Sequence, residues 1–255
     1  GLLLEKGVRV GYLFLFGGRR GDTARHKWRW LGGFCGDPLC GAPPPVFFVG
    51  GGGGGDGWIK YEETLRSHSP SFRKLDISET DLITINYTSG TTARPKGVMI
   101  THRNAYVNIM GTLAHHHLTP TDRYLWTLPM FHANGWTFTW INTARGMVHV
   151  CLRKVEPLLI YQRIKEENIT MFCAAPTVLI SIANVPENIR AGAPKGIRLF
   201  TAGAPPAAAT IELIERELGW VLTHVYGLTE TSPLITICEP LPEHQNLSIE
   251  DRAKI

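Results

Sequence analysis

Long apolar stretches are absent from this sequence. No apolar run approaches the ~20 residues that span a bilayer, and the longest near the start, residues 12–16, is shorter than a signal-peptide core. The sequence therefore predicts no transmembrane segment. Because it begins at Gly1 and not at methionine, it offers no N-terminal signal from which a compartment can be assigned.

Cysteine and net charge are also low. The five cysteines are an odd number at wide spacings, which argues against a disulfide framework and for a reducing compartment. Cys35 and Cys40 are not followed by a second ligand pair, so no zinc site is predicted. A net charge of +4 from scattered basic residues argues against a nucleic-acid partner. None of these features indicates an oligomeric state.

Glycine, in contrast, is concentrated near the start. Residues 1–57 hold 17 of the 27 glycines, including the run 50–55, and show little periodicity. Glycine raises the entropy that folding must remove, so we expect this unassigned Gly/Pro-rich segment to be disordered. A nucleotide-binding glycine loop at residues 50–57 is the alternative, but the strand-then-helix context that aims N–H groups at phosphate is missing.

Residues 58–255 have the apolar periodicity of a folded domain. Ile83, Ile85 and Tyr87 alternate with polar residues, which predicts a strand. The helical period of Ile211, Ile214 and Leu218 predicts a helix over residues 206–218. Further short apolar runs, each predicted as a strand, lie at residues 98–100, 124–128, 148–152, 171–174, 198–201 and 221–225.

This alternation of strands and helices predicts an α/β fold in which a layered, largely parallel sheet is covered by helices. Ligands bind such folds at the carboxyl ends of the strands. Unusually polar loops follow the predicted strands at residues 88–96, 131–136, 174–177, 201–206 and 226–231. We therefore expect several of these loops to meet at one site.

The first of these loops suits polyphosphate. Hydroxyls and backbone N–H groups can wrap phosphate oxygens, and Lys96 adds a compact positive charge. It is not a P-loop, because Lys96 precedes its glycine; for its composition alone, a polar surface turn is the alternative. The candidate nucleotide-binding residues are Thr88, Ser89, Gly90, Thr91, Thr92 and Lys96.

In its order, the string Thr-Ser-Gly-Thr-Thr-Ala-Arg-Pro-Lys-Gly at residues 88–97 resembles the phosphate-binding signature of the adenylate-forming (AMP-dependent synthetase/ligase) superfamily. A second string, Tyr-Gly-Leu-Thr-Glu-Thr at residues 226–231, is similar to the aromatic-Gly-x-Thr-Glu motif of that family. By this resemblance Tyr226 and Gly227 lie beside adenine, Thr229 contacts the α-phosphate, and Glu230 binds Mg²⁺. The chemistry suits them, because an aromatic face stacks on a base and a carboxylate is a hard ligand for a hard cation.

Two further loops fit the same family. Gly203, Ala204 and Pro205 resemble its Gly-Ala-Pro loop, whose backbone passes adenine, although a plain strand-to-helix turn has the same composition. The loop at residues 129–136 resembles the substrate-side loop, where His132 either contacts the carboxylate or only anchors the loop. Trp136, Phe138 and Trp140 either line an acyl pocket or, by their spacing of two, pack as a buried strand.

Consecutive histidines on a helix point about 100° apart, so His115, His116 and His117 do not share a metal easily. We expect them to form a solvated helix end.

The resemblance covers residues 58–255, which are similar to the middle of the large domain of plant acyl-activating enzymes and bacterial short- or medium-chain fatty-acyl-CoA synthetases. It implies ATP-dependent activation of a carboxylic acid to acyl-AMP and then acyl-CoA, with Mg²⁺, in the cytoplasm or peroxisome. The family's aspartate motif and C-terminal domain are not present, so we expect an inactive fragment of the large N-terminal domain. The alternatives are a nucleotide-binding remnant and an adenylating enzyme with an acceptor other than CoA.

Overall fold

The computed structural model describes residues 47–48, 59–69, 71, 76–88, 95–244 and 246–252, and the chain forms two compact units, Gly1–Ser78 and Glu79–Ile255. In the first unit, β1 (Phe47–Phe48) pairs in parallel with β2 (Ile59–Lys60), and α2 (Tyr61–Ser67) follows. Most of residues 1–57 lies outside the described residues, as do residues 89–94 of the expected phosphate loop. The predicted disorder of residues 1–57 and the domain boundary after residue 57 stay predictions.

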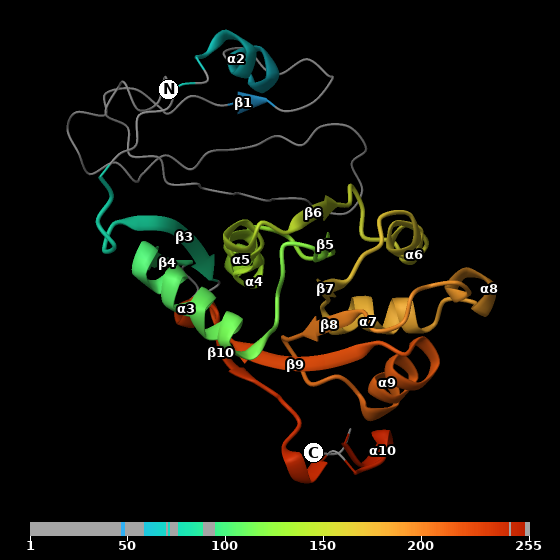
Figure 1. Cartoon of the computed structure of the whole chain (residues 1–255). Coiled ribbons are helices and arrows are strands. Elements are labelled where there is room, and N and C mark those ends of the chain that lie inside the picture. The colour runs from blue at the N-terminus through green and yellow to red at the C-terminus, as the bar shows by residue number, and fades with distance from the viewer. Residues whose placement is uncertain are drawn as a thin grey trace. The chain divides into compact units, whose positions relative to one another are not determined.

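The second unit is built on a six-stranded sheet in the order β10-β9-β8-β7-β5-β6 (Figure 1). Every neighbouring pair is parallel except β9 with β10, which is antiparallel. The prediction of an α/β fold with a largely parallel sheet is confirmed. The strands are β5 (Arg123–Trp126), β6 (Val148–Cys151), β7 (Met171–Cys173), β8 (Arg198–Thr201), β9 (Val221–Gly227) and β10 (Leu234–Ile237).

Helices cover both faces of this sheet, because successive side chains of a strand point to opposite faces. In β5, Leu125 packs in one apolar cluster with α6 and α7, whereas Tyr124 and Trp126 pack in the other with α5. Figure 1 shows the same arrangement, with α3 and α5 on one side of the strands and α6, α7 and α9 on the other. The helices are α5 (Phe138–Arg145), α6 (Pro157–Glu166), α7 (Pro176–Ala183), α8 (Glu187–Arg190) and α9 (Ala208–Leu213).

The helix predicted over residues 206–218 starts later than its pattern indicated. Ala207 is still extended (φ −63°, ψ 141°), so α9 begins at Ala208. After Leu213 the chain widens into a π-helical turn, η1 (Ile214–Leu218), whose Ile214 and Leu218 are buried. The predicted apolar face is therefore present, although the helix that carries it is shorter and irregular.

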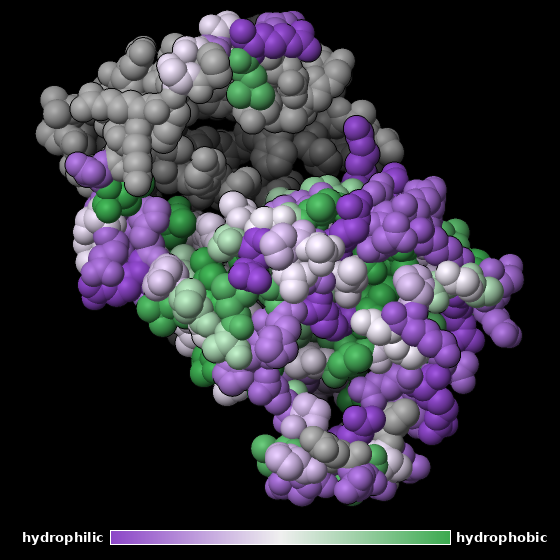
Figure 2. Space-filling model, viewed as in Figure 1, coloured by the Kyte–Doolittle hydropathy of each residue, from purple (hydrophilic) through white to green (hydrophobic). Residues whose placement is uncertain are grey.

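A separate hairpin precedes the large sheet. Strands β3 (Leu82–Thr88) and β4 (Lys96–Thr101) pair antiparallel, and α3 (His102–His115) begins with a capping box between Thr101 and Asn104. Figure 2 shows apolar side chains on the surface over this region, where Met99, Tyr106, Val107 and Met110 are exposed. The second unit ends in η3 (Pro242–His244) and α10 (Ile249–Arg252).

Two expectations about individual residues are corrected. Trp136 and Phe138 are buried, but Phe138 and Trp140 lie in helix α5, so the buried-strand interpretation is wrong. His115 and His117 are exposed as expected, whereas the ring of His116 packs edge-on against Phe200 at a centroid distance of 4.4 Å. His116 is therefore part of the packing and not of a solvated end. Within the described residues, the structure has no helix long and apolar enough to cross a membrane.

Candidate active site

A pocket of about 90 Å³ opens at the carboxyl ends of β8 and β9, the edge of the sheet where the sequence predicted a ligand site. Three separate segments form its walls. They follow β5, β8 and β9 in the chain, so the parallel sheet brings them together. The lining residues are His132, Ala133, Trp136, Ala202, Gly203, Gly227, Leu228, Thr229, Pro233 and Leu234.

The floor of the pocket depends on a close backbone crossing. At Gly227, an added Cβ would lie 1.9 Å from the carbonyl oxygen of Pro233, so only glycine fits there. The hydroxyl of Thr231 donates to the carbonyl oxygens of Leu228 and Pro233. The same hydroxyl accepts a hydrogen bond from the N–H of Leu228 at 2.9 Å. These bonds fold residues 227–233 into a compact turn around η2 (Thr229–Thr231).

Because Thr231 makes the internal bonds of the turn, its neighbours are left for other partners. Among the described residues, neither the half-buried hydroxyl of Thr229 nor the exposed carboxylate of Glu230 has a side-chain hydrogen bond or ion pair. The two side chains leave the same short turn at the rim of the pocket. They are thus a donor and an anion available to a ligand.

The hydroxyl of Thr229 and the carboxylate of Glu230 suit a Mg²⁺ ion that is held mainly by substrate and water. The described part of the chain has no group of three or more His, Cys, Asp or Glu side chains that would form a ready-made metal site. Mg²⁺ commonly binds through one or two carboxylates while substrate phosphates and water supply the other oxygens. The single carboxylate of Glu230 beside a nucleotide pocket suits that kind of coordination.

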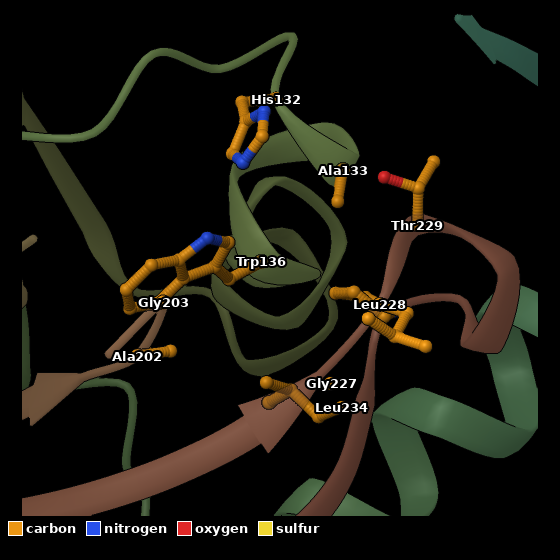
Figure 3. A pocket seen from close by; sticks show the side chains of 10 residues that line it. His132, Ala133, Trp136, Ala202, Gly203, Gly227, Leu228, Thr229 and Leu234 are labelled. Carbon is orange, nitrogen blue, oxygen red and sulfur yellow. The ribbon is translucent and has the colours of Figure 1, made fainter. Parts of the chain in front are cut away.

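The opposite wall comes from the segment that begins at His132. Figure 3 shows the His132 ring and the Trp136 indole on one side of the pocket, with Leu228 and Thr229 across from them. His132 is exposed and Trp136 is only 8% exposed. The walls are otherwise small or apolar, so the pocket combines an imidazole and a hydroxyl with space for a small apolar group.

The structure brings together some of the predicted site residues but not all of them. His132, Gly203, Gly227 and Thr229 line the pocket, and the exposed Glu230 adjoins it. Three other predicted site residues are exposed and do not line the pocket. Ala204 and Pro205 come after the lining residue Gly203, and Tyr226 comes before Gly227.

The predicted phosphate loop is described only at its ends. Thr88 and Lys96 are cross-strand partners at the end of the β3–β4 hairpin, and Lys96 is exposed. Neither residue lines the pocket. The predicted contacts Ser89, Gly90, Thr91 and Thr92 lie outside the described residues, so their role stays a prediction.

The sequence analysis missed several wall residues. Ala133, Ala202 and Leu228 adjoin motif residues and could have been included as their neighbours. Pro233 and Leu234 carry no signal of their own, because they reach the pocket only through the tight turn at Gly227.

Comparison with known proteins identifies the family. A family model described as "AMP-binding enzyme" matches residues 53–251, which is most of the chain. The chain belongs to the AMP-binding enzyme family. The resemblance to the adenylate-forming superfamily is therefore confirmed.

Individual relatives agree with this assignment. The chain is 44% identical over 177 residues to 4-hydroxybutyrate–CoA ligase 2 of Metallosphaera sedula, covering 69% of this chain and 32% of the relative. It is 42% identical over 186 residues to the peroxisomal benzoate–CoA ligase of Arabidopsis thaliana, covering 69% and 31%. The chain thus spans about a third of the length of these curated relatives.

A solved structure shows a similar arrangement. O-succinylbenzoate coenzyme A synthetase from Bacillus subtilis, in complex with ATP and magnesium ion, superimposes with a TM-score of 0.58 at 28% identity. The match covers 72% of this chain and 38% of that one. It supports the fold of this AMP-binding enzyme independently of the motifs.

Proposed function

We propose that this chain provides the nucleotide- and acid-binding part of an enzyme that activates a carboxylic acid with ATP and passes the acyl group to CoA. The observation that carries the proposal is the pocket itself. His132, Gly203, Gly227 and Thr229 are far apart in the sequence, were each predicted as site residues, and line one cavity at the carboxyl edge of the sheet.

Each residue has a role that suits its chemistry. Lys96 supplies a positive charge for the phosphates, and the hydroxyl of Thr229 donates to the α-phosphate, where negative charge develops as the carboxylate attacks. Glu230 would hold Mg²⁺, which when bound neutralises phosphate charge. Tyr226, half exposed at the end of β9, offers a ring face for adenine, and the Gly203–Pro205 backbone follows the neighbouring strand β8.

The acid would lie between His132 and Trp136. The imidazole of His132 can donate a hydrogen bond to a carboxylate, and the indole of Trp136 forms an apolar wall. Two relatives are named for short or compact acids, 4-hydroxybutyrate and benzoate, so we propose a short aliphatic or aromatic acid. As compartments we propose the cytoplasm or the peroxisome, the latter because one relative is named peroxisomal.

The test uses a chimera, because the chain matches only about a third of its relatives. Residues 79–252 replace the matching segment of the Metallosphaera ligase, and acid-dependent exchange of radiolabelled pyrophosphate into ATP is measured with acetate through decanoate and with benzoate. We expect exchange with a short or compact acid and acyl-CoA after CoA is added. Exchange without acyl-CoA would indicate another acceptor. AMP binding without exchange would identify a nucleotide-binding remnant.

The 255-residue chain is assayed alongside the chimera. We propose that it does not turn over alone, because catalysis requires groups held around the reacting phosphate to within about 1 Å. Acyl-CoA formation by the chain alone would contradict this.

A further inference from the structure

The wall of the pocket that carries His132 and Trp136 has an unusual backbone. Five consecutive residues have left-handed φ values: Ala133 (37°), Asn134 (45°), Gly135 (61°), Trp136 (53°) and Thr137 (71°). For L-residues this conformation costs roughly 1–2 kcal/mol each, because Cβ approaches the following carbonyl oxygen. Glycine and asparagine tolerate it best, whereas a β-branched threonine is a genuine outlier there. The turn therefore needs support from outside itself.

Asn134 provides that support toward β3. Its Nδ2 donates to Oγ1 of Thr84 at 3.2 Å, and its Oδ1 accepts from Nδ2 of Asn86 at 2.5 Å. All three residues are buried, with 4%, 4% and 9% exposure for Asn134, Thr84 and Asn86. A buried side-chain amide with both hydrogen bonds made resists displacement, because breaking either bond leaves a buried polar group with neither a protein partner nor water.

The other end of the turn is fixed from the opposite direction. The hydroxyl of Thr137 lies 2.8 Å from Oδ1 of Asn108 on α3 and 3.3 Å from the carbonyl oxygen of Ser232. Asn108 in turn donates to the carbonyl oxygen of Leu234 at 2.8 Å. In the middle of the turn, the ring of Trp126 leaves no room for a side chain at Gly135, where an added Cβ would lie 2.5 Å away. Backbone strain is thus balanced by contacts on every side.

We propose that Asn134 is a positioning residue for acid binding. Its bonds to Thr84 and Asn86 hold the left-handed turn against β3, and the turn holds His132 and Trp136 at the pocket. The tolerance of asparagine for a left-handed backbone does not by itself account for the two buried hydrogen bonds of Asn134. An exposed asparagine can adopt the same backbone without any buried partner. The inference rests on the proposed function, since it assigns the acyl group to this wall.

The test separates binding of the acyl group from binding of the nucleotide. The probes are AMP and 5′-O-(N-butanoylsulfamoyl)adenosine, an unreactive mimic of an acyl adenylate, and the measured quantity is the ratio of their dissociation constants for the 255-residue chain. Asn134→Gly keeps the left-handed backbone accessible and removes the amide. We expect the advantage of the acyl mimic over AMP to fall about tenfold, as for the loss of roughly one to two buried hydrogen bonds, with AMP affinity unchanged within about twofold.

Asn168→Gly is the matched control. Asn168 is also left-handed, with φ 49°, but it is exposed and precedes β7 at the other edge of the sheet. This variant should keep the full ratio. Asn86→Ala removes one of the two bonds to Asn134 and leaves the bond to Thr84 and the turn itself unaltered. It should lower the advantage of the acyl mimic over AMP in the same direction as Asn134→Gly, which keeps the test valid if Asn134→Gly does not fold.

The failures are distinguishable. If the unaltered chain binds AMP but the ratio is the same in Asn134→Gly or Asn86→Ala, the positioning role is wrong and the nucleotide site stands. If the mimic binds the unaltered chain no better than AMP, the acyl group is not held at this wall, and the inference is again overturned. If the unaltered chain does not bind AMP at all, the proposed function is wrong, and the inference that rests on it is wrong too.

Discussion

Lys96 is the residue with the clearest electrostatic role in the proposal. It is exposed at the start of β4, and among the described residues it has no ion-pair partner. In the chimera, Lys96→Ala should slow pyrophosphate exchange by about 2–4 kcal/mol of transition-state stabilisation, because a charge that faces phosphate is lost. Lys154→Ala, which removes the partner of Glu156, is the control and should leave exchange unchanged. An unaltered rate for Lys96→Ala at saturating Mg·ATP would remove the lysine from the mechanism.

Gly227 is the residue on which the pocket floor depends most directly. A methyl group there would overlap the Pro233 backbone, so Gly227→Ala must push residues 227–233 apart. We expect a loss of about 2 kcal/mol or more in the free energy of unfolding, measured with urea. The same substitution at Gly111, where a Cβ meets nothing within 4 Å in the middle of α3, should stabilise the chain by about 0.5–1 kcal/mol. Equal effects at the two glycines would show that the crossing is not tight.

His116 makes stability depend on pH. Burial lowers the pKa of His116 from 6.5 to about 4; the nearby Glu239 opposes this shift, and His115 and Arg198 add to it. Its Nε2 has no hydrogen-bond partner among the described residues. Between pH 6.5 and 4 the unfolded chain therefore binds more protons than the folded one, so the free energy of unfolding falls as the pH is lowered through this window.

After allowance for the partial exposure of the ring, this loss is on the order of 1–2 kcal/mol. The measurement is the urea midpoint between pH 7 and 4. His116→Phe, which keeps a ring against Phe200, should flatten the dependence, whereas His117→Phe at an exposed position should not. A slope that survives in His116→Phe would assign the effect to other groups.

At the scale of elements, one carboxylate joins the amino ends of three strands. Asp122 precedes β5 and accepts hydrogen bonds from Thr119 and, at 2.8 Å, from Thr170 before β7; it also pairs with Arg198 of β8. Burial opposes its ionisation, but these hydrogen bonds and the Arg198 charge outweigh burial and lower its pKa. Because the site lies at the edge of the sheet opposite the pocket, its contribution is to stability.

Asp122→Ala should therefore cost about 2–4 kcal/mol in unfolding free energy, since it leaves the half-buried guanidinium of Arg198 without its carboxylate. AMP affinity of the folded fraction should not change. Glu166→Ala, which breaks an exposed pair with Arg163, should cost less than about 0.5 kcal/mol. The idea fails if the two variants unfold at the same urea concentration.

Regular elements were predictable where the apolar period was clear. The alternation at Ile83, Ile85 and Tyr87 correctly predicted β3, and short apolar runs predicted β5 to β9. The runs are clearest at β5, β7 and β8, where most residues of the strand are buried. The polar loops at strand ends correctly indicated the edge of the sheet that carries the pocket.

The rest depended on contacts between distant segments, which a local pattern does not contain. The left-handed turn at residues 133–137 is hydrogen-bonded to Thr84 and Asn86, about fifty residues earlier. Of the two alternatives for the aromatic residues in and after it, the buried strand is wrong, although Trp136 and Phe138 are buried and Trp136 also lines the pocket. Likewise the half-buried ring of His116 packs against Phe200, more than eighty residues later in the chain.

At the scale of the whole molecule, the second unit contains everything on which the pocket depends. Both apolar clusters, the six-stranded sheet and all lining residues lie in Glu79–Ile255. We expect a chain of residues 79–255 to unfold at the same temperature as the 255-residue chain, within about 3 °C, and to bind AMP equally well, measured by calorimetry. A much lower melting temperature would show that residues 1–78 stabilise the second unit.

Except for β9, the strands of the large sheet are only three or four residues long, and this has a consequence for how the protein can change. In β7, Met171 and Cys173 belong to one apolar cluster and Phe172 to the other. The three residues of this strand therefore pack against helices on both faces of the sheet. We therefore expect a substitution in α6 or α7 that shifts Phe172 to disturb Met171 and Cys173 as well, which pack in the cluster that contains Trp136. Under the proposed function, substitutions in helices on the far side of the sheet should therefore alter acid preference without touching the acid.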